Sequence, residues 1–392
     1  MNYQSVSIRW VVAGLVGLAA LLAATPARAQ TPDEILRQAV QPCVDHHAVA
    51  GAVMLVADRN RVLSLTAVGW ADRAGHQRMQ PDNLFWIASM TKPMTAAALM
   101  MLVDEGRVQL DDPVEKYLPE FKGQMYRAYH FLRLAPSHPI TVREILSHTS
   151  GLPHILPSEQ PTLDAWPLRV SVSRYAAATL QFDPGTDYRY SNAGFNTVGR
   201  LIEVVSGMPY AQFLQARLFD PLQMTNTTFW PTAAQLQHLA KTYAPDEAGD
   251  GGQERPIRML RYPLSDRVHR YPLPSGGLFS TAADTAKFCQ LFLNDGVSRG
   301  KRLLSVAAVR EMTRRQNPPS SGQGYGLGLT VDGDRCGHNG VCGTSMTMDL
   351  KRGLALVWLV QQGGPADGGV TGLTAFQQAA DGLFATPAHP VP

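Results

Sequence analysis

The chain has 392 residues, of which 45% are hydrophobic and 17% are charged. This balance is typical of a globular protein, and the length is sufficient for a large core arranged in two lobes. The formal charge of +3 gives no indication of nucleic-acid binding, so we expect no nucleic-acid partner.

Residues 1–29 have the pattern of a secretory signal peptide. Arg9 precedes an uncharged apolar run over residues 10–24, and Ala27-Arg28-Ala29 is a small-x-small cleavage site before Gln30. The apolar run is shorter than the roughly 20 residues of a membrane-spanning helix. We therefore expect a periplasmic or secreted mature chain, residues 30–392, with no stable membrane span after cleavage. The alternative is an uncleaved membrane anchor.

The first third of the mature chain predicts a helix, two strands and a second helix. Thr31 begins a capping box that Glu34 closes, with Pro32 in the first turn. The second helix is apolar on most of its surface, so we expect it to be central, and Pro93 must lie in its first turn, close to Ser89. The expected elements are a helix at 31–44, strands at 51–56 and 62–68, and a helix from about 89 to 105.

Helical patterns dominate from about residue 107 to 275. Thr141 and Glu144 form a second capping box. Residues 245–275 are rich in glycine, proline and arginine and show little periodicity. A loop of this length is usually functional, so we expect it to form a wall or lid over the site. The expected helices cover residues 114–118, 141–147, 175–180, 196–205 and 210–218.

Strand patterns return in the last third of the chain. Because strands occur at both ends, we predict an α+β fold: one antiparallel sheet built from both chain ends, flanked by helices, with an inserted mainly helical lobe. The α/β lobe would comprise about residues 30–106 and 276–392, and the helical lobe about residues 107–275. The expected elements are helices at 281–294, 305–314 and 374–384, and strands at 325–331, 335–348 and 354–361.

Four cysteines are too few for a fold built on disulfides, although export permits them. Cys336 and Cys342 flank part of a predicted strand. Because six strand residues span about 20 Å, we expect that these two do not pair with each other. Pairings that involve Cys43 or Cys289 stay open. No spacing indicates a metal site, and we predict no cofactor.

Ser89 and Lys92 are a candidate nucleophile and its base. Residues three apart on a helix lie on one face, about 5–6 Å apart. The lysine can accept the serine proton, and a helix N-terminus favours developing negative charge. The spacing alone also occurs by chance in a chain of this length.

Two later stretches contain further candidate site residues. Tyr190 and Asn192 lie in a turn-rich stretch before a helix; such a tyrosine can act as general acid or base, and the asparagine can bind a carbonyl or hold the lysine. His338-Asn339-Gly340 is expected in mid-strand, where the glycine permits close approach of a ligand. Taken alone, the first stretch would be interpreted as an ordinary turn before a helix and His338 as an ordinary strand histidine.

In order and approximate spacing, Ser89-Met90-Thr91-Lys92, Tyr190-Ser191-Asn192 and His338-Asn339-Gly340 resemble the three motifs of the serine β-lactamase and DD-peptidase superfamily. The likeness is greatest to the branch of class C β-lactamases, D-alanyl-D-alanine carboxypeptidases and family VIII carboxylesterases. Residues 146–152 and 275–281 also resemble that branch, and the resemblance covers nearly all of residues 32–384. It implies a β-lactamase/transpeptidase-like fold and a serine hydrolase.

The resemblance also implies roles for single residues. Ser89 would be the acylated nucleophile, and Lys92 and Tyr190 would share proton transfer, with the choice of general base left open. The backbone N–H groups of Ser89 and Val341 would form an oxyanion hole. The implied substrate-binding residues are Asn192, His338, Asn339, Gly340 and Val341.

One departure from the family pattern concerns His338, where β-lactamases usually carry lysine. A histidine is mostly neutral at pH 7 and offers less charge to a substrate carboxylate. We therefore expect a carboxylesterase or D-amino-acid peptidase-like activity on a small-molecule ester or amide, with cell-wall peptide as a further substrate. The alternatives are a true β-lactamase, and a penicillin-binding or cell-wall-sensing module that acylates without turnover.

A different hydrolase class is weighed because Gly296-Val297-Ser298-Arg299-Gly300 matches a nucleophile elbow. Asp332 or Asp334, then His338, follow in the order of an α/β-hydrolase. An elbow needs a strand before it and a helix directly after it, whereas here a predicted helix ends at Gly296. We therefore interpret this stretch as a helix end followed by a turn.

Overall fold

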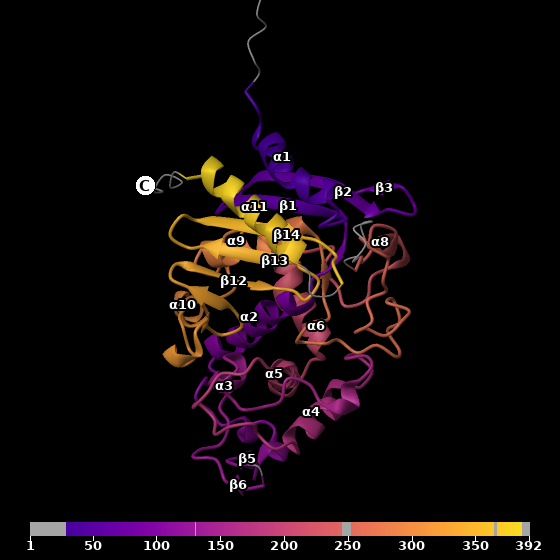
Figure 1. The fold of residues 1–392 in the computed structure, drawn as a ribbon. Helices are drawn as coiled ribbons and strands as arrows, with labels where there is room; N and C mark the ends of the chain where they lie inside the picture. The colour runs from indigo at the N-terminus through magenta and orange to yellow at the C-terminus, as the bar shows by residue number, and fades with distance from the viewer. Residues whose placement is uncertain (1–28, 130, 245–251, 364–366, 386–392) are drawn as a thin grey trace, which may run out of the picture. The chain divides into compact units, whose positions relative to one another are not determined.

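The computed structural model describes residues 29–129, 131–244, 252–363 and 367–385 (Figure 1). The predicted signal peptide lies outside these residues, apart from Ala29, and the expectation of its cleavage stays a prediction. Within the described ranges, no helix has both the length and the apolar character that crossing a membrane requires. A structural unit begins at Pro32 and contains all the helices and strands named here.

An eight-stranded antiparallel sheet joins the two ends of the chain, as predicted. Its strand order is β10-β11-β12-β13-β14-β1-β2-β3. At its centre, β1 (Gly51–Asp58) pairs with β14 (Leu354–Leu359), and Val53 lies opposite Leu359. The other strands are β2 (Val62–Asp72), β3 (Gln77–Arg78), β10 (Gly324–Tyr325), β11 (Thr330–Asp332), β12 (Arg335–Asn339) and β13 (Ser345–Asp349).

Helices cover both faces of the sheet (Figure 1). Alternate residues of β1 enter two different cores: Val53 and Leu55 pack with α2 (Thr91–Asp104) and α9 (Ala282–Leu293), whereas Met54 and Val56 pack with α1 (Pro32–Asp45) and α11 (Asp367–Leu383). Successive strand residues point to opposite faces, so a strand covered on both sides must be apolar throughout. This explains the unbroken apolar run of β1.

The helix α2 lies between the sheet and the helical part of the chain. Every residue from Thr91 to Leu102 is buried, which confirms that this helix is central. The remaining helices are α3 (Val142–Leu146), α4 (Leu168–Ala176), α5 (Asn192–Ser206), α6 (Tyr210–Leu214), α7 (Asp220–Leu222), α8 (Ala233–Gln237) and α10 (Val306–Thr313). Short strand pairs join β4 (Phe85–Trp86) to β7 (Phe279–Ser280), β5 (Tyr126–Arg127) to β6 (Arg133–Leu134), and β8 (Val297–Ser298) to β9 (Lys301–Arg302). The exact bounds of the two lobes stay a prediction.

Two of the predicted C-terminal strands are each divided by a turn. The strand expected at 325–331 is β10 and β11, separated by a turn in which Gly328 has φ +83°. The strand expected at 335–348 is β12 and β13, separated by a turn that the N–H of Gly340 closes on the carbonyl of Thr344. Glycines lie in both turns, and Asn339-Gly340 is itself a turn signal, but the strand-forming residues on either side favoured one continuous strand in each prediction. His338 therefore lies near the end of a strand and not in its middle.

Two predicted helix positions are also wrong. The helix expected at 175–180 is α4, which begins at Leu168 and ends at Ala176, before Leu180 forms a bridge with Tyr126. The closing helix expected from residue 374 begins at Asp367. The glycines at 368, 369 and 372 led the sequence analysis to place the start of this helix too late, because glycine has a low helix propensity.

The four cysteines, all of them in described parts of the chain, are buried free thiols. The argument that strand length separates Cys336 from Cys342 is wrong, because the turn after β12 lies between them. Burial raises the pKa of each of these two thiols to about 12, which keeps them protonated and unreactive.

Candidate active site

Ser89 lies in a one-turn 3₁₀ helix (Ala88–Met90) that leads directly into α2, so the predicted helix start is correct to within one turn. Ala88 has φ +45°, a left-handed conformation that is unfavourable for a residue with a side chain. Hydrogen bonds hold this turn: Thr91 Oγ1 donates to the carbonyl of Ala88, and the N–H of Ile87 donates to the carbonyl of Leu278. The half-buried Ser89 is therefore presented on a constrained turn at the end of a buried helix.

Lys92 is completely buried, and its amine contacts three oxygen atoms. Nζ lies 2.6 Å from the carbonyl oxygen of Ser275, 2.8 Å from Oδ1 of Asn192 and 3.3 Å from Oγ of Ser89. Burial lowers the pKa of Lys92 well below the usual range of a lysine. A neutral amine can donate to the two carbonyl oxygens and direct its lone pair at the hydroxyl of Ser89.

Tyr190 approaches Ser89 from the segment before α5. Ser191 is the N-cap of that helix, and its hydroxyl accepts the N–H of Gly194. The phenol hydroxyl of Tyr190 shares a hydrogen bond with Ser89, and its ring centre lies 4.5 Å from Nζ of Lys92. Burial raises the pKa of Tyr190 above its usual value, so the phenol is protonated at neutral pH.

Asn192 connects Lys92 to a histidine that sequence analysis did not select. Its Oδ1 accepts from Lys92, while its Nδ2 donates to Nε2 of His154 at 3.1 Å. These two contacts agree on the orientation of the amide. His154 is exposed, yet partial desolvation lowers its pKa below its usual value. Lys92, Asn192 and His154 thus form a continuous chain of hydrogen bonds.

His338 lies in a layer behind the cleft. Its Nδ1–H donates to the carbonyl of Asn339 at 2.8 Å, so its Nε2 accepts the hydroxyl proton of Tyr325 at 3.1 Å. Burial lowers the pKa of His338 to about 3, which agrees with this neutral tautomer. The ring of His338 lies 6.1 Å from the ring of Tyr190. Its neighbours Asn339, Gly340 and Val341, and not His338, line the cleft.

Gly340 is required by packing inside the protein. A Cβ at this position would lie 2.6 Å from the carbonyl oxygen of Ile87 and 2.1 Å from Oγ1 of Thr344. No real Cβ tolerates such contacts, so only glycine lets the end of β12 approach the segment that contains Ser89. The glycine of the third motif therefore sets the distance between two sides of the site.

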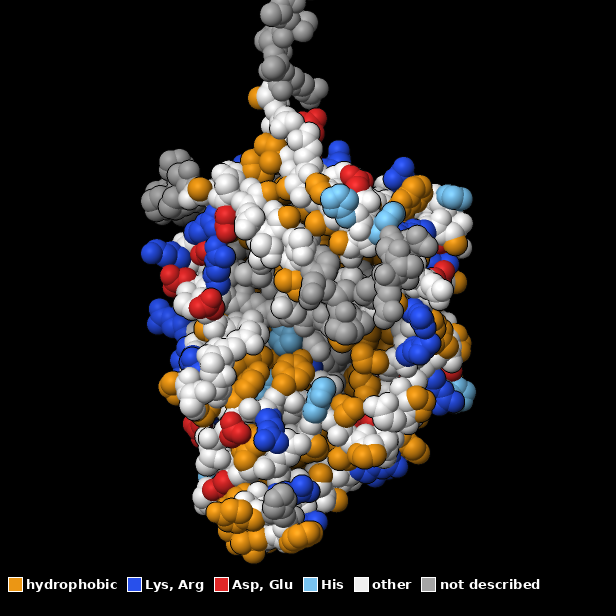
Figure 2. Space-filling view, viewed as in Figure 1, with side chains coloured by type: hydrophobic (Ala, Val, Ile, Leu, Met, Phe, Trp, Pro, Cys, Tyr) orange, Lys and Arg blue, Asp and Glu red, His pale blue; other side chains and the backbone are white. Residues whose placement is uncertain are grey.

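The cleft in front of Ser89 has a volume of about 440 Å³. Among the described residues, no lysine, arginine, aspartate or glutamate lines this cleft. Described residues of the 245–275 segment contribute to this wall, as predicted, while residues 245–251 lie outside the described ranges. The apolar lining residues are Trp86, Ala88, Ile155, Pro161, Leu163, Met259, Leu273 and Val341, and the polar ones are Ser89, His154, Gln160, Tyr190, Asn192, Ser275 and Asn339. Figure 2 shows hydrophobic and histidine side chains gathered in the middle of one face of the molecule.

A larger cavity of about 630 Å³ lies on the other side of His338, against β11, β12 and β13. It contains neither Ser89 nor Lys92 nor Tyr190. The smaller cleft is therefore the candidate active site, because Ser89 in its lining lies within hydrogen-bond distance of Lys92 and of the Tyr190 hydroxyl. Among the described residues, no cluster of three or more histidine, cysteine, aspartate or glutamate side chains could hold a metal ion.

The alternative nucleophile Ser298 lies in a small hairpin, where its β8 pairs with β9 and Ser298 is opposite Lys301. The preceding helix, α9, ends at Leu293, and Arg299 and Gly300 both have positive φ values, as a tight turn requires. No strand leads into a helix at Ser298. This confirms the interpretation of the stretch as a helix end followed by a turn, and it excludes a nucleophile elbow at Ser298.

Sequence reasoning missed the second layer of the site. His148, His154 and the carbonyl of Ser275 all contact the candidate catalytic residues or the segment that carries them. His148 and Ser275 lie in the stretches 146–152 and 275–281, which were noted only as resembling a family. That resemblance was the one sequence signal that pointed to His148 and Ser275, and it did not indicate which residues they contact.

Comparisons with known proteins show the family and the fold of the chain. A family model described as Beta-lactamase matches residues 36–380. The chain is 31% identical over 268 residues to Esterase EstB of Burkholderia gladioli, covering 61% of this chain and 64% of that protein. It is 27% identical over 338 residues to D-alanyl-D-alanine-carboxypeptidase/endopeptidase AmpH of Escherichia coli strain K12, covering 82% and 81%. The solved structure of EstCE1, a hydrolase with promiscuous acyltransferase activity, matches with a TM-score of 0.74 and 25% identity, covering 89% and 98%.

Proposed function

The chain belongs to the beta-lactamase family and is a serine hydrolase, and from this premise we propose that it hydrolyses uncharged, apolar carboxylic esters through an acyl-enzyme on Ser89. One observation supports the proposal above the others: a buried Lys92 between Ser89 and two carbonyl oxygens, at the edge of an apolar cleft. The lysine supports covalent catalysis, and the cleft supports the class of substrate.

Acylation begins with the neutral amine of Lys92, which takes the proton of Ser89 as Oγ attacks the ester carbonyl. Tyr190 is a poor base in this state because burial keeps its phenol protonated. We therefore assign the general base of acylation to Lys92. When the tetrahedral intermediate collapses, the ester C–O bond breaks, and the leaving alkoxide receives a proton from Tyr190, which Lys92 replenishes.

The developing oxyanion needs two fixed donors. We propose the backbone N–H groups of Ser89 and Val341, which both line the cleft. Asn192 holds Lys92 through Oδ1. In the second half of the reaction a water molecule attacks the acyl carbon and gives its proton to the Tyr190–Lys92 pair. The bond between the acyl carbon and Oγ of Ser89 then breaks, Oγ takes the proton back from that pair, and the carboxylic acid leaves.

The absence of charged side chains from the cleft lining bears on substrate choice. A β-lactam or a D-alanyl peptide carries a carboxylate, and burying that charge without a cation or enough donors is unfavourable. The neutral, buried His338 supplies no positive charge to the cleft. A neutral ester has no charge to bury. Its apolar part stabilises the complex by about 25 cal/mol for each Å² of apolar surface that the cleft removes from water.

The test compares three substrates on the purified protein: p-nitrophenyl butyrate, nitrocefin and a D-alanyl-D-alanine peptide. We expect sustained ester turnover at least 10-fold more efficient than turnover of the other two. A fluorophosphonate probe should modify Ser89, as mapped by mass spectrometry, and should not modify Ser298. Nitrocefin or peptide turnover above ester turnover would refute the ester assignment. A burst of acylation without a steady state would show a penicillin-binding module.

We also propose that the protein is exported and acts in the periplasm or outside the cell, with the leader removed before Gln30. The motivation is the signal-like pattern of residues 1–29. N-terminal sequencing of protein expressed with its leader should begin at Gln30. Recovery of the intact leader in the membrane fraction would show an anchor.

A further inference from the structure

We propose that His148 is the positioning residue for Tyr190: it holds the backbone on both sides of the tyrosine and one face of its ring. The inference rests on the proposed function, because it concerns the residue that passes the proton to the leaving group. His148 touches neither Ser89 nor the cleft, so its role is to position and not to react.

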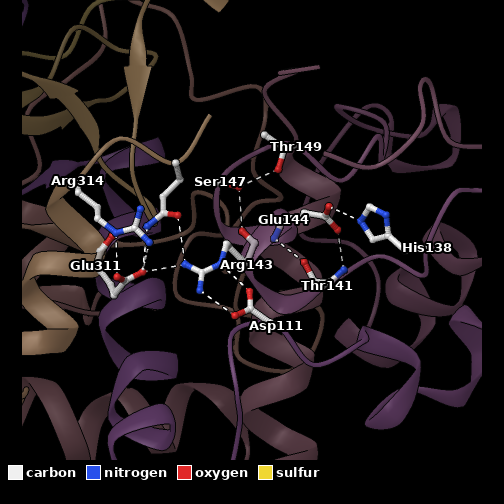
Figure 3. Close-up of polar contacts among 10 residues, drawn as sticks. Asp111, His138, Thr141, Arg143, Glu144, Ser147, Thr149, Glu311 and Arg314 are labelled. Carbon is white, nitrogen blue, oxygen red and sulfur yellow. Dashed lines mark hydrogen bonds and ion pairs between the residues drawn. The ribbon is translucent and has the colours of Figure 1, made fainter. Parts of the chain in front are cut away.

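The position of His148 begins with α3, the short helix before it. Its capping box is complete, since the N–H of Glu144 donates to Oγ1 of Thr141 and the N–H of Thr141 donates to Oε2 of Glu144. Figure 3 shows these contacts and the ion pairs of Arg143, which binds Asp111 and Glu311 at the same time. Two chain segments distant in sequence therefore fix the helix.

The end of α3 then places His148 in an unusual conformation. The hydroxyl of Ser147 bonds back to the carbonyl of Arg143, and Oγ1 of Thr149 bonds to that hydroxyl (Figure 3). His148 has φ +61°, in the left-handed region that residues other than glycine and asparagine avoid. Such strain persists only where the surroundings determine it, and it is concentrated at functional sites. In this conformation the carbonyl oxygen and Nδ1 of His148 both face the same segment of the chain.

That segment is the one that carries Tyr190. The N–H of Arg189 donates to the carbonyl of His148 at 2.9 Å, and the N–H of Ser191 donates to Nδ1 of the imidazole at 3.0 Å. The ring of His148 lies 4.4 Å from the ring of Tyr190, with 39° between the planes. His148 thus binds the N–H groups of the two residues that flank Tyr190 and packs against the ring of Tyr190.

The protonation state of His148 suits this role. Since Nδ1 accepts the N–H of Ser191, the proton of the neutral ring is on Nε2. Nε2 is buried and has no hydrogen-bond partner among the described residues. The imidazole of His148 is surrounded by the rings of Tyr188, Phe195 and Tyr325. Burial lowers the pKa of His148 well below its usual value, so the ring stays neutral and Nδ1 remains available as an acceptor.

Two substitutions separate the hydrogen bond that His148 accepts from Ser191 from the contact between its ring and Tyr190. His148→Phe keeps an aromatic ring against Tyr190 but cannot accept the N–H of Ser191. His148→Asn keeps a carbonyl acceptor and tolerates positive φ but loses the ring. We expect each to lower kcat for p-nitrophenyl butyrate about 100-fold, the typical effect of a small misplacement of a catalytic group, with KM within threefold of wild type. The control is His138→Asn, which removes a histidine bound to Glu144 of the same α3 and should leave kcat within twofold.

A double-mutant cycle distinguishes positioning from a general structural role. In a Tyr190→Phe background, His148→Asn should lower kcat less than threefold further, because the group it positions is already absent. A full 100-fold loss in that background would overturn the proposal. Ser89→Ala decides the proposed function separately: if it retains ester turnover, the acyl-enzyme assignment fails, whatever the cycle shows.

A second measurement depends neither on activity nor on a folded His148 variant. Protein labelled with 3-fluorotyrosine is examined by fluorine NMR, and the Tyr190 resonance is identified by its loss in Tyr190→Phe. A ring clamped by His148 should give a resonance shifted away from that of free fluorotyrosine and unchanged by added soluble quencher. A resonance at the position of a solvated tyrosine would overturn the proposal even if the esterase mechanism is correct.

Discussion

The chain contains two serine-x-x-lysine pairs of identical spacing, and they differ in everything else. Ser89 and Lys92 lie on a constrained turn over a buried helix, with the lysine 0% exposed. Ser298 and Lys301 face each other across a small hairpin, where Lys301 is exposed to solvent. The comparison teaches that spacing provides only the opportunity for a nucleophile and base, while burial changes the basicity of the amine.

The physical cause lies in the solvation of the amine. A lysine in water is a strongly hydrated ammonium ion and cannot accept a proton. Lys92 has no access to water, and desolvation lowers its pKa well below the usual range. The two carbonyl oxygens of Asn192 and Ser275 hold the amine beside Ser89. No equivalent environment is possible on a two-residue hairpin.

The largest expected effect separates the two serines. Ser89→Ala should lower kcat for p-nitrophenyl butyrate at least 10⁴-fold, because the nucleophile and its proton acceptors act as a unit. Ser298→Ala is the matched control and should leave kcat within twofold. Both are measured by steady-state ester hydrolysis with thermal melts to verify folding. Equal losses in the two variants would contradict the assignment of Ser89.

The next effect separates the two lysines. Lys92→Met has a similar volume and should lower kcat by about 10³-fold, within the range for loss of a general base combined with a misplaced serine. Lys301→Met should have no measurable effect. Rapid acylation by the fluorophosphonate probe in Lys92→Met would show that Ser89 is activated by another group.

The pH dependence tests whether Lys92 behaves as a buried base. Acylation needs the neutral amine, so kcat/KM should rise with pH through the pKa of Lys92 and then reach a plateau. Because burial lowers that pKa well below 10.5, the plateau should be complete well below pH 10.5. Burial raises the pKa of Tyr190, so its ionisation should cause no loss below pH 10. A rate still rising at pH 10 would contradict the assignment of Lys92 as a buried base with a lowered pKa.

The smallest expected effect concerns how two buried histidines, His148 and His338, contribute to the free energy of unfolding. Burial lowers the folded-state pKa of His148 and His338 below the unfolded value of about 6.5, so both bind protons more readily when unfolded. Their contribution is therefore complete above pH 6.5 and is lost as the pH falls. Between pH 7.5 and 5.5 the free energy of unfolding should fall by about 1.4 kcal/mol for each histidine.

Urea unfolding at the two pH values measures this loss, and His338→Gln should remove about half of it. The matched control is His138→Gln, because the side chain of His138 is partly exposed. A wild-type free energy of unfolding that does not change between the two pH values would contradict the burial of these imidazoles in a neutral state.

Most of the fold could be predicted because it depends on local patterns. The capping box of Thr141 and Glu144, the central apolar helix and the sheet built from both ends are all legible in hydrophobic periodicity and end signals. The errors occurred where these signals conflict. Glycines and Asn339-Gly340 mark turns inside 325–331 and 335–348, but the strand-forming residues around them favoured a single strand in each case, and α4 begins directly after Pro167.

The amino-acid sequence by itself determined the candidate nucleophile, its neighbouring lysine and the family, because these depend on residue type and order. Only the tertiary structure decided which Ser-x-x-Lys pair is buried, that His338 lies behind the cleft, and that His148 holds Tyr190. The physical reason is distance along the chain. Lys92 meets Asn192 100 residues later and Ser275 183 residues later, and desolvation acts only after folding brings such segments together.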